Sequence, residues 1–226
     1  NLTNSDGLQD AGVDLAGDDY ILQRNVISHN NGDGVRSTGS FAGTAPISSE
    51  NIIGLTADGT SAAGNDGAGF RVASGSGVVV GFAQQTIGGN SGPGIVIESD
   101  DNSVFANYVG TNVAGDAAIP NGGGGINVLG NGNTLSSNVV SGNSGDGIRV
   151  GSGSIPADNT SIASTNVGVN ANGDAILGNI GDGIDVIQGS GTTIDGNVIG
   201  GNTSTGIEID AVNSSVDERT VITGNY

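Results

Sequence analysis

The sequence predicts an all-β solenoid, a stack of about eight coils of three short strands each. Three segments of 22 residues resemble one another without a gap, at 51–72, 107–128 and 165–186. Each segment ends in an apolar-polar-apolar triplet, and this two-residue period is typical of a half-buried strand. Glycine accounts for 44 of the 226 residues and proline for only 4, without the three-residue period of collagen.

Two landmarks set the length of each coil. The first is an Asn before an apolar pair, and this position holds Asn25, Asn51, Gln85, Asn107, Asn138, Thr165, Asn197 and Asn225. The second is the Gly before an apolar-x-apolar triplet, at Gly12, Gly34, Gly69, Gly94, Gly125, Gly147, Gly183 and Gly206. Steps of 9 and 18 residues from the first landmark to the second alternate, so short and long coils are expected to alternate.

Each coil holds three strand candidates separated by Gly, Asn, Ser or Asp. Strands this short cannot bury an apolar face alone, so they should stack in parallel at roughly 4.8 Å per coil. Frequent glycine and the two-residue period exclude helices. Alternation points Ile148 and Val150 inward and Arg149 outward. The equivalent outward positions should form one row: Asp14, Arg36, Arg71, Val96, Asn127, Arg149, Asp185 and Glu208.

The Asn landmark lies at a turn, where its amide can bond the equivalent Asn of the next coil as well as local backbone. We therefore predict that these Asn residues are scaffold and not ligands. The recurring glycines suit left-handed turns or close approach between coils.

The charge is strongly acidic, with 23 Asp and Glu against five Arg and a formal net charge of −18. Nucleic acid and anionic membranes are therefore not expected partners, because both need clustered cationic side chains. The sequence has no Cys, which removes disulfides and thiolate chemistry. No apolar run approaches the roughly 20 residues of a membrane span.

One recurring motif resembles that of a known family. The motif is G-N-x-I/V-S/G-x-N-x-x-x-G-I-x-V, and it is seen best at 137–150 and 196–209. It resembles the right-handed parallel β-helix of the pectin-lyase-like superfamily, and within it the repeat arrays of bacterial secreted and surface proteins. The resemblance extends from about Gly12 to Asn225. It implies a right-handed parallel β-helix, but this fold hosts lyases, hydrolases, adhesins, phage spikes and inert stalks.

The resemblance keeps an enzyme alternative open, a polysaccharide lyase or glycoside hydrolase. Hydrolases need convergent carboxylates, and one candidate pair is Asp182 with Asp185. Asp14 with Asp18 is another, although both pairs are also typical of solvated turns. The superfamily's lyases imply Ca²⁺ and an Arg base, and no Arg here lies in a matching context. No catalytic residue is carried over, because Arg24, Arg36, Arg71, Arg149 and Arg219 all fail this comparison.

His29, the only histidine, lies in a short-coil turn where other coils carry Gly, so we expect a surface residue. Without a second His or any Cys, a transition-metal site is not expected. Calcium is possible, though the sequence does not require it, because hard oxygen ligands lie among glycines in the long coils. The weak candidates are Asp58, Asp66, Asp116, Asn121, Asp174 and Asn179.

The sequence favours one β-helix rod over 1–226, without catalytic activity, as a segment of an extracellular or cell-surface fibre, stalk or adhesin. The first residues resemble the interior of a long coil and the last ones its start, so we expect the rod to continue past both ends. Its partners would be copies of itself or flanking repeats, end to end. The inserted loops at 57–65, 113–121 and 171–179 should project from one corner, roughly 9.6 Å apart, where a glycan or surface receptor could bind.

Overall fold

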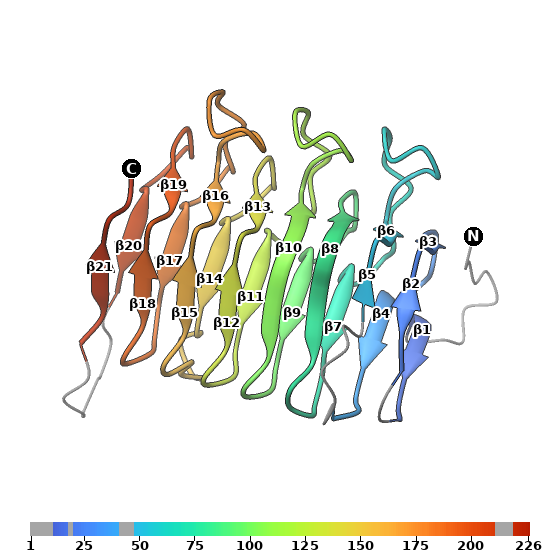
Figure 1. Cartoon of the computed structure of the whole chain (residues 1–226), viewed down its shortest axis with the longest axis horizontal. Coiled ribbons are helices and arrows are strands. Elements are labelled where there is room, and N and C mark those ends of the chain that lie inside the picture. Colours follow the sequence, from blue (N-terminus) through green and yellow to red (C-terminus); the bar gives the residue numbers. More distant parts are fainter. Residues whose placement is uncertain (1–10, 18–19, 41–47, 211–218) are drawn as a thin grey trace.

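The computed structural model of the chain describes residues 11–17, 20–40, 48–210 and 219–226. Within these ranges the regular elements are strands, which stack in parallel along one axis (Figure 1). The strands form an eight-stranded and a thirteen-stranded sheet, in which each strand pairs with its counterparts in the neighbouring coils. The predicted stack of short and long coils is confirmed.

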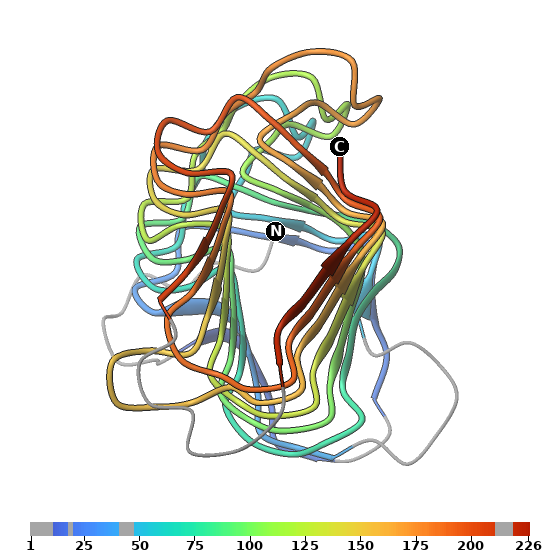
Figure 2. The ribbon, with the colours of Figure 1, turned by 90° about the vertical axis from the view of Figure 1, so that its left-hand side faces the viewer.

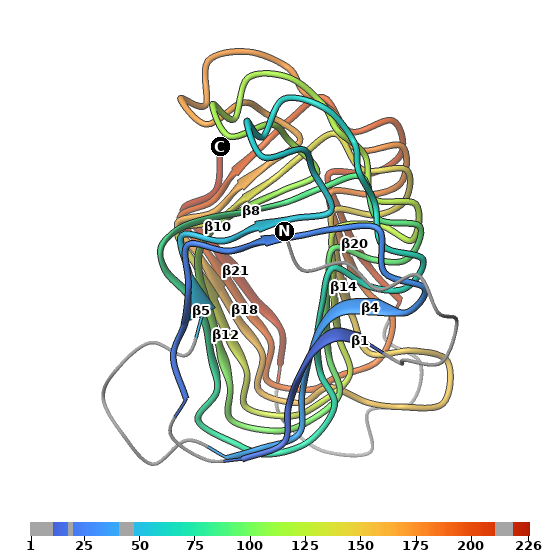
Figure 3. The ribbon, with the colours of Figure 1, turned by 90° about the vertical axis from the view of Figure 1, so that its right-hand side faces the viewer.

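The eight-stranded sheet contributes one strand per coil and forms one wall of the solenoid (Figure 3). Its strands are β1 (Ala11–Leu15), β4 (Asp33–Ser37), β7 (Phe70–Val72), β9 (Ile95–Ile97), β11 (Ile126–Val128), β14 (Ile148–Val150), β17 (Ile184–Val186) and β20 (Ile207–Ile209). The Gly landmark directly precedes six of these strands and is the second residue of β1 and β4.

The thirteen-stranded sheet bends around a corner and supplies the other two walls (Figures 2 and 3). One wall holds β2 (Leu22–Gln23), β5 (Ser48–Ser49), β12 (Thr134–Ser136), β15 (Ser161–Ala163), β18 (Thr193–Asp195) and β21 (Val221–Thr223). The other holds β3 (Val26–Ile27), β6 (Ile52–Ile53), β13 (Val139–Val140), β16 (Asn166–Val167) and β19 (Val198–Ile199). The long strands β8 (Val79–Ile87) and β10 (Ser103–Val109) pass through the corner and belong to both.

The core is a narrow column of aliphatic side chains, because each strand turns alternate residues inward. Ile148 and Val150 are fully buried, whereas Arg149 between them is exposed. Phe70 is the one aromatic side chain among the largest fully buried residues. The strand registers also confirm the predicted outward row, pairing Asp14 with Arg36 at one end and continuing to Asp185 with Glu208 at the other.

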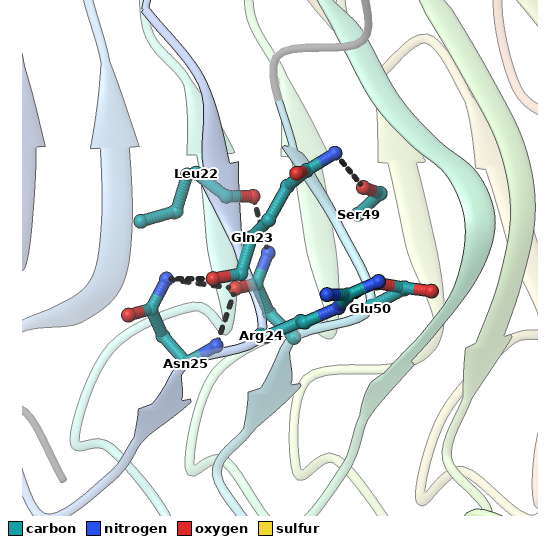
Figure 4. Close-up of polar contacts among 7 residues, drawn as sticks. Leu22, Gln23, Arg24, Asn25, Ser49 and Glu50 are labelled. Carbon is teal, nitrogen blue, oxygen red and sulfur yellow. Dashed lines mark hydrogen bonds and ion pairs between the residues drawn. The ribbon is translucent and has the colours of Figure 1, made fainter.

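The Asn landmark forms the predicted ladder along the corner. Asn25 Nδ2 donates to Asn51 Oδ1 at 3.1 Å, and Asn51 Nδ2 continues to Gln85 Oε1 at 2.8 Å. Asn197 Nδ2 donates to Asn225 Oδ1 at 2.9 Å near the other end. Figure 4 shows Asn25 at this corner, with Gln23 reaching Ser49 and Arg24 beside Glu50 on the adjacent coil. The prediction that these residues are scaffold is consistent with their burial in the solenoid wall.

A second ladder, which the sequence analysis did not predict, follows the turn before the eight-stranded sheet. In it each Asn lies four residues before the Gly landmark, and each Nδ2 donates to the next Oδ1 at 2.7–3.0 Å. Its members are Asn30, Asn65, Asn90, Asn121, Asn143, Asn179 and Asn202. The ladder is unbroken, because all seven positions keep the same amide side chain.

The long-coil loops project beyond the wall that contains β6 and β16 (Figures 1 and 3), each closed at its base by an antiparallel bridge such as Leu55 with Ala62. The sequence predicts three loops that project separately, roughly 9.6 Å apart. In the structure the loops instead contact one another. Val113 N donates to Gly59 O at 3.2 Å, and Ala171 N donates to Gly115 O at 2.9 Å. The hairpins are long enough to lean along the axis and hydrogen-bond across the intervening short coil, so they form one continuous ridge.

One corner departs from the repeat. Gln85 lies five residues after Val80, whereas Asn107 lies only three residues after Val104 in the paired segment of the next coil. The strand pairing shifts between these points. The extra residues form a bulge, and Phe82 at its tip is 63 % exposed. The two landmarks keep their regular spacing around this bulge, so their spacing does not reveal it.

Candidate functional site

The acidic loop residues proposed for calcium are exposed and already bonded within their own hairpins. Asp58 Oδ1 accepts from Thr56 Oγ1 at 2.5 Å and from Thr60 N at 3.2 Å. These hydrogen bonds lower the pKa of Asp58 below its usual value. Asp116 and Asp174 occupy the next two loops, where the carboxylate accepts from Asn112 Nδ2 and Asn170 Nδ2 respectively. Each carboxylate therefore stabilises a turn of its own loop.

The remaining calcium candidates lie elsewhere. Asn121 and Asn179 are buried rungs of the second ladder, where each Oδ1 accepts two hydrogen bonds from the preceding rung. Asp66 is exposed on the turn that follows the rung Asn65. The structure thus places two of the six candidates in the wall and four at the surface. In the described part of the chain, no three His, Cys, Asp or Glu side chains group closely enough to hold a metal ion.

Two clusters of charged side chains occupy the outer face of the eight-stranded sheet. In the first, Arg71 Nε lies 2.6 Å from Asp33 Oδ2, and Arg71 Nη1 lies 2.5 Å from Glu98 Oε1. Asp33 Oδ1 also accepts from Ala68 N at 2.7 Å, so the carboxylate bridges a side chain and the next coil. A shallow groove here is lined by Asn31, Gly32, Asp33, Arg36, Arg71, Ala73 and Glu98. Its charges are largely balanced within the cluster.

The second cluster brings together both members of one predicted carboxylate pair. Asp182 precedes β17, and Asp185 lies at its outward position, directly beside Glu208 of β20 in the strand register. The Asp182 and Glu208 side chains interact, and each shifts the pKa of the other. That contact and the Asp182 charge raise the pKa of Glu208. Burial acts to raise the pKa of Asp182, but hydrogen bonds from Ser204, Thr205 and Glu208 together lower it.

Asp185 is the buried member of this cluster. Its side chain is 9 % exposed, and its Oδ1 atom has no hydrogen-bond partner. Burial and the charge of Asp146 raise its pKa to about 6, against the opposing attraction of Arg149. Arg149 Nε lies 3.6 Å from Asp185 Oδ2 and 3.8 Å from Asp146 Oδ2, which is too long for a direct hydrogen bond.

Sequence reasoning named Asp182 with Asp185, and its outward row placed Glu208 beside Asp185, but it missed Asp146 as a neighbour of the pair. The signal was present in the register, since Asp146 and Asp182 each lie three residues before an outward position of the row. The other predicted pair, Asp14 with Asp18, stays a prediction. Asp14 lies on β1, and Asp18 lies outside the described residues. His29 is exposed at its turn, as predicted.

This second cluster differs from the open carboxyl pair of a glycosidase. Glycosidases hold their two carboxyl groups about 5 Å apart when they retain configuration, and further apart when they invert it. Asp182 Oδ1 instead accepts from Thr205 N of the next coil at 2.6 Å, and the Asp185 side chain is 9 % exposed. Both members of the predicted pair therefore take part in the contact between coils.

The stacked parallel sheets, with a three-walled coil and side-chain ladders, define a parallel β-helix solenoid. The family described as right handed beta helix region matches residues 1–162, so the chain belongs to that family. Neither a curated protein nor a solved structure matches the chain. No helix in the described ranges is long and apolar enough to cross a membrane.

Proposed function

We propose that this chain is a non-catalytic structural segment of a secreted or cell-surface protein, serving in an extracellular fibre, stalk or adhesin. The observation that carries the proposal is the pair of side-chain ladders. The second ladder is continuous from Asn30 to Asn202, whereas the first extends from Asn25 to Asn138 and, after Thr165, from Asn197 to Asn225. Buried polar networks that are fully satisfied rigidify a structure. A rod built on two such ladders suits a mechanical role.

The outer surface supports the same role. Arg71 joins Asp33 and Glu98, and exposed Arg24 pairs with Glu50 at 2.5 Å on the neighbouring coil. These ion pairs link successive coils. They also occupy the Arg side chains that an acidic ligand would need for binding. The ridge of long-coil loops adds a further line of backbone hydrogen bonds along the axis.

We further propose that the partner of the rod is another coil of the same construction, supplied by a second copy or by flanking repeats. The outer edge of the β20 and β21 coil supports this, since Val221 is 44 % and Ile222 is 46 % exposed there. Unpaired strand edges favour strand addition. In the inner rungs, backbone N and Nδ2 both donate to the next Oδ1, and a further coil would supply that acceptor to Asn202 and Asn225, whose Nδ2 atoms also donate to Val167 O and Ile194 O.

The ridge of loops is the surface that we propose for a glycan or a surface receptor. Ile176 is 77 % exposed and Ile180 is 64 % exposed, both in the third long coil. The equivalent residues in the first long coil are Ala62 and Asp66, so Ile176 belongs to the last loop of the ridge and Ile180 to the turn that follows the rung Asn179. Glycan-array binding that is lost in Ile176→Ser with Ile180→Ser would support a partner at this surface.

The test of the structural role combines assembly with enzymology. Purified protein is examined by analytical ultracentrifugation and electron microscopy, and end-to-end rods are expected. Val221→Lys with Ile222→Lys, at the edge, should shorten the rods, whereas Val113→Lys, on the ridge, should not. A discrete monomer at high concentration, unchanged by the edge variant, would contradict end-to-end assembly.

The enzyme alternative keeps one specific observation in its favour, the raised pKa of Asp185 in a carboxylate cluster on the sheet face. It would act as a polysaccharide lyase or glycoside hydrolase. The protein is incubated with acidic and neutral polysaccharides, with and without Ca²⁺, and products are separated by chromatography. Cleavage that is lost in Asp185→Asn and kept in Asp116→Asn would replace the structural proposal with this one.

A further inference from the structure

The carboxyl cluster on β14, β17 and β20 joins three successive coils. Arg149, Asp185 and Glu208 follow one another in register along the outward row. One row behind them, Asp146 Oδ1 accepts from Asp182 N at 2.9 Å, and Asp182 Oδ1 accepts from Thr205 N at 2.6 Å. The cluster therefore lies at the seam by which the β20 coil docks on the β17 coil.

This seam depends on protons. The strand register places Asp185 directly opposite Glu208 on the outer face of the sheet. Like charges that face each other directly across paired strands are destabilising. When both carboxyl groups are ionised, the same register that docks the coil holds two negative charges side by side.

Asp185 adds to this dependence because it is enclosed by charge from each coil that packs against it. The coil below supplies Asp146 and Arg149, its own coil supplies Asp182, and the coil above supplies Glu208 and Asp210. Arg149 is the one cation among these described neighbours. The Oδ1 atom of Asp185 is buried without a partner, and burial of an unpaired charge is costly.

We propose that this carboxyl cluster is a pH-sensitive clasp, which holds the β20 coil on the β17 coil in acid and loosens it toward neutral pH. The clasp concerns how coils dock, and it is independent of whether the protein is structural or catalytic. The loosened unit is the β20 coil, whose strand is only half-buried and has one neighbour in its sheet.

The sign follows from the direction of each shift. The folded-state pKa of Asp185 is raised from 3.8 to about 6, so its contribution is present in acid and is lost as the pH rises through about 6. The raised pKa of Glu208 acts in the same direction. The lowered pKa of Asp182 acts oppositely, and its contribution is lost only as the pH falls below the ordinary value of 3.8. The working window is therefore about pH 4.5 to 7.5.

Amide hydrogen exchange tests the clasp in the full chain. The opening constant of the β20 amides, corrected for the intrinsic exchange rate, is compared with that of β11 at both ends of the window. A shift of two pKa units corresponds to about 100-fold, so we expect β20 opening to increase between about 10-fold and 100-fold relative to β11.

Two neutral variants and one control decide the assignment. Asp185→Asn and Glu208→Gln keep the side-chain shape without the charge, and each should flatten the pH dependence of β20 exchange. Asp174→Asn, on the exposed loop of the same coil as β17, should leave it unchanged. Equal pH dependence in β20 and β11 of the unmodified chain would overturn the proposal, as would full pH dependence in both neutral variants.

Discussion

Replacing Asn121 by Ala should test the second ladder more sharply than any other single change. Asn121 is fully buried. Its Oδ1 accepts from Asn90 N at 3.2 Å and from Asn90 Nδ2 at 2.9 Å. Its Nδ2 donates to Ile87 O at 3.1 Å and to Asn143 Oδ1 at 3.0 Å. The substitution removes all four contacts while leaving the strands intact.

The magnitude follows from which groups lose their last partner. Ile87 O keeps the hydrogen bond from Gly110 N, and Asn143 Oδ1 keeps the one from the backbone of residue 121. Asn90 N and one Nδ2 hydrogen of Asn90 are left without an acceptor in the interior. A buried polar group without a partner costs about 1–3 kcal/mol. We therefore expect a loss of about 3–4 kcal/mol in the free energy of unfolding, at the upper end of ordinary point mutations.

The assay is urea denaturation followed by far-UV circular dichroism, with Asn112→Ala as the matched control. Asn112 also makes side-chain hydrogen bonds, to Asp116 at 2.8 Å and from Asp116 N at 3.1 Å, but on an exposed loop. Water can replace those contacts, so the control should lose about 1 kcal/mol or less. Because solenoids need not unfold in two states, hydrogen exchange of the Asn90 coil is measured alongside.

The reasoning would be refuted if Asn121→Ala lost less than about 1 kcal/mol, or no more than Asn112→Ala. Either result would mean that the ladder adds no net stability beyond the strand pairing. Faster exchange confined to the Asn90 and Asn121 coils would locate the lost stability at the ladder, but it would not restore the predicted magnitude if the global loss were this small.

Three further outcomes are expected. His29 has φ 58 and an exposed side chain, so His29→Gly should stabilise the chain by about 0.5–1 kcal/mol in urea, and destabilisation would contradict this. Gly110→Ala should lower the free energy of unfolding by more than about 3 kcal/mol, because its Cβ would lie 2.3 Å from Asn143 Oδ1. Gly196→Ala, with open space around its Cβ, should lower it by about 1 kcal/mol, and equal losses would contradict the packing argument. Chelating Ca²⁺ should leave the urea midpoint unchanged, since Asn121 already uses its oxygen in the ladder, and a lower midpoint would reveal a calcium site.

Much of the architecture followed from the sequence because a solenoid is built from nearest-neighbour contacts. The two landmark spacings gave the coils, the two-residue period gave inward and outward faces, and both were confirmed down to the register of Arg149 with Asp185. The second ladder was equally legible, since Asn recurs four residues before each inner Gly landmark. Two of its members, Asn121 and Asn179, also fit the pattern of calcium ligands near glycines, and that interpretation hides their place in the ladder.

The chain by itself determined the fold, the alternation of coils and the strongly acidic surface, since these depend on local period and composition. Only the tertiary structure decided which acids meet. Asp146 and Asp182 are far apart in sequence, and the hydrogen bond from Asp182 N to Asp146 Oδ1 depends on how coils of unequal length align. It also decided that the long loops touch, because the direction in which a hairpin leans is set by the neighbours on which it packs.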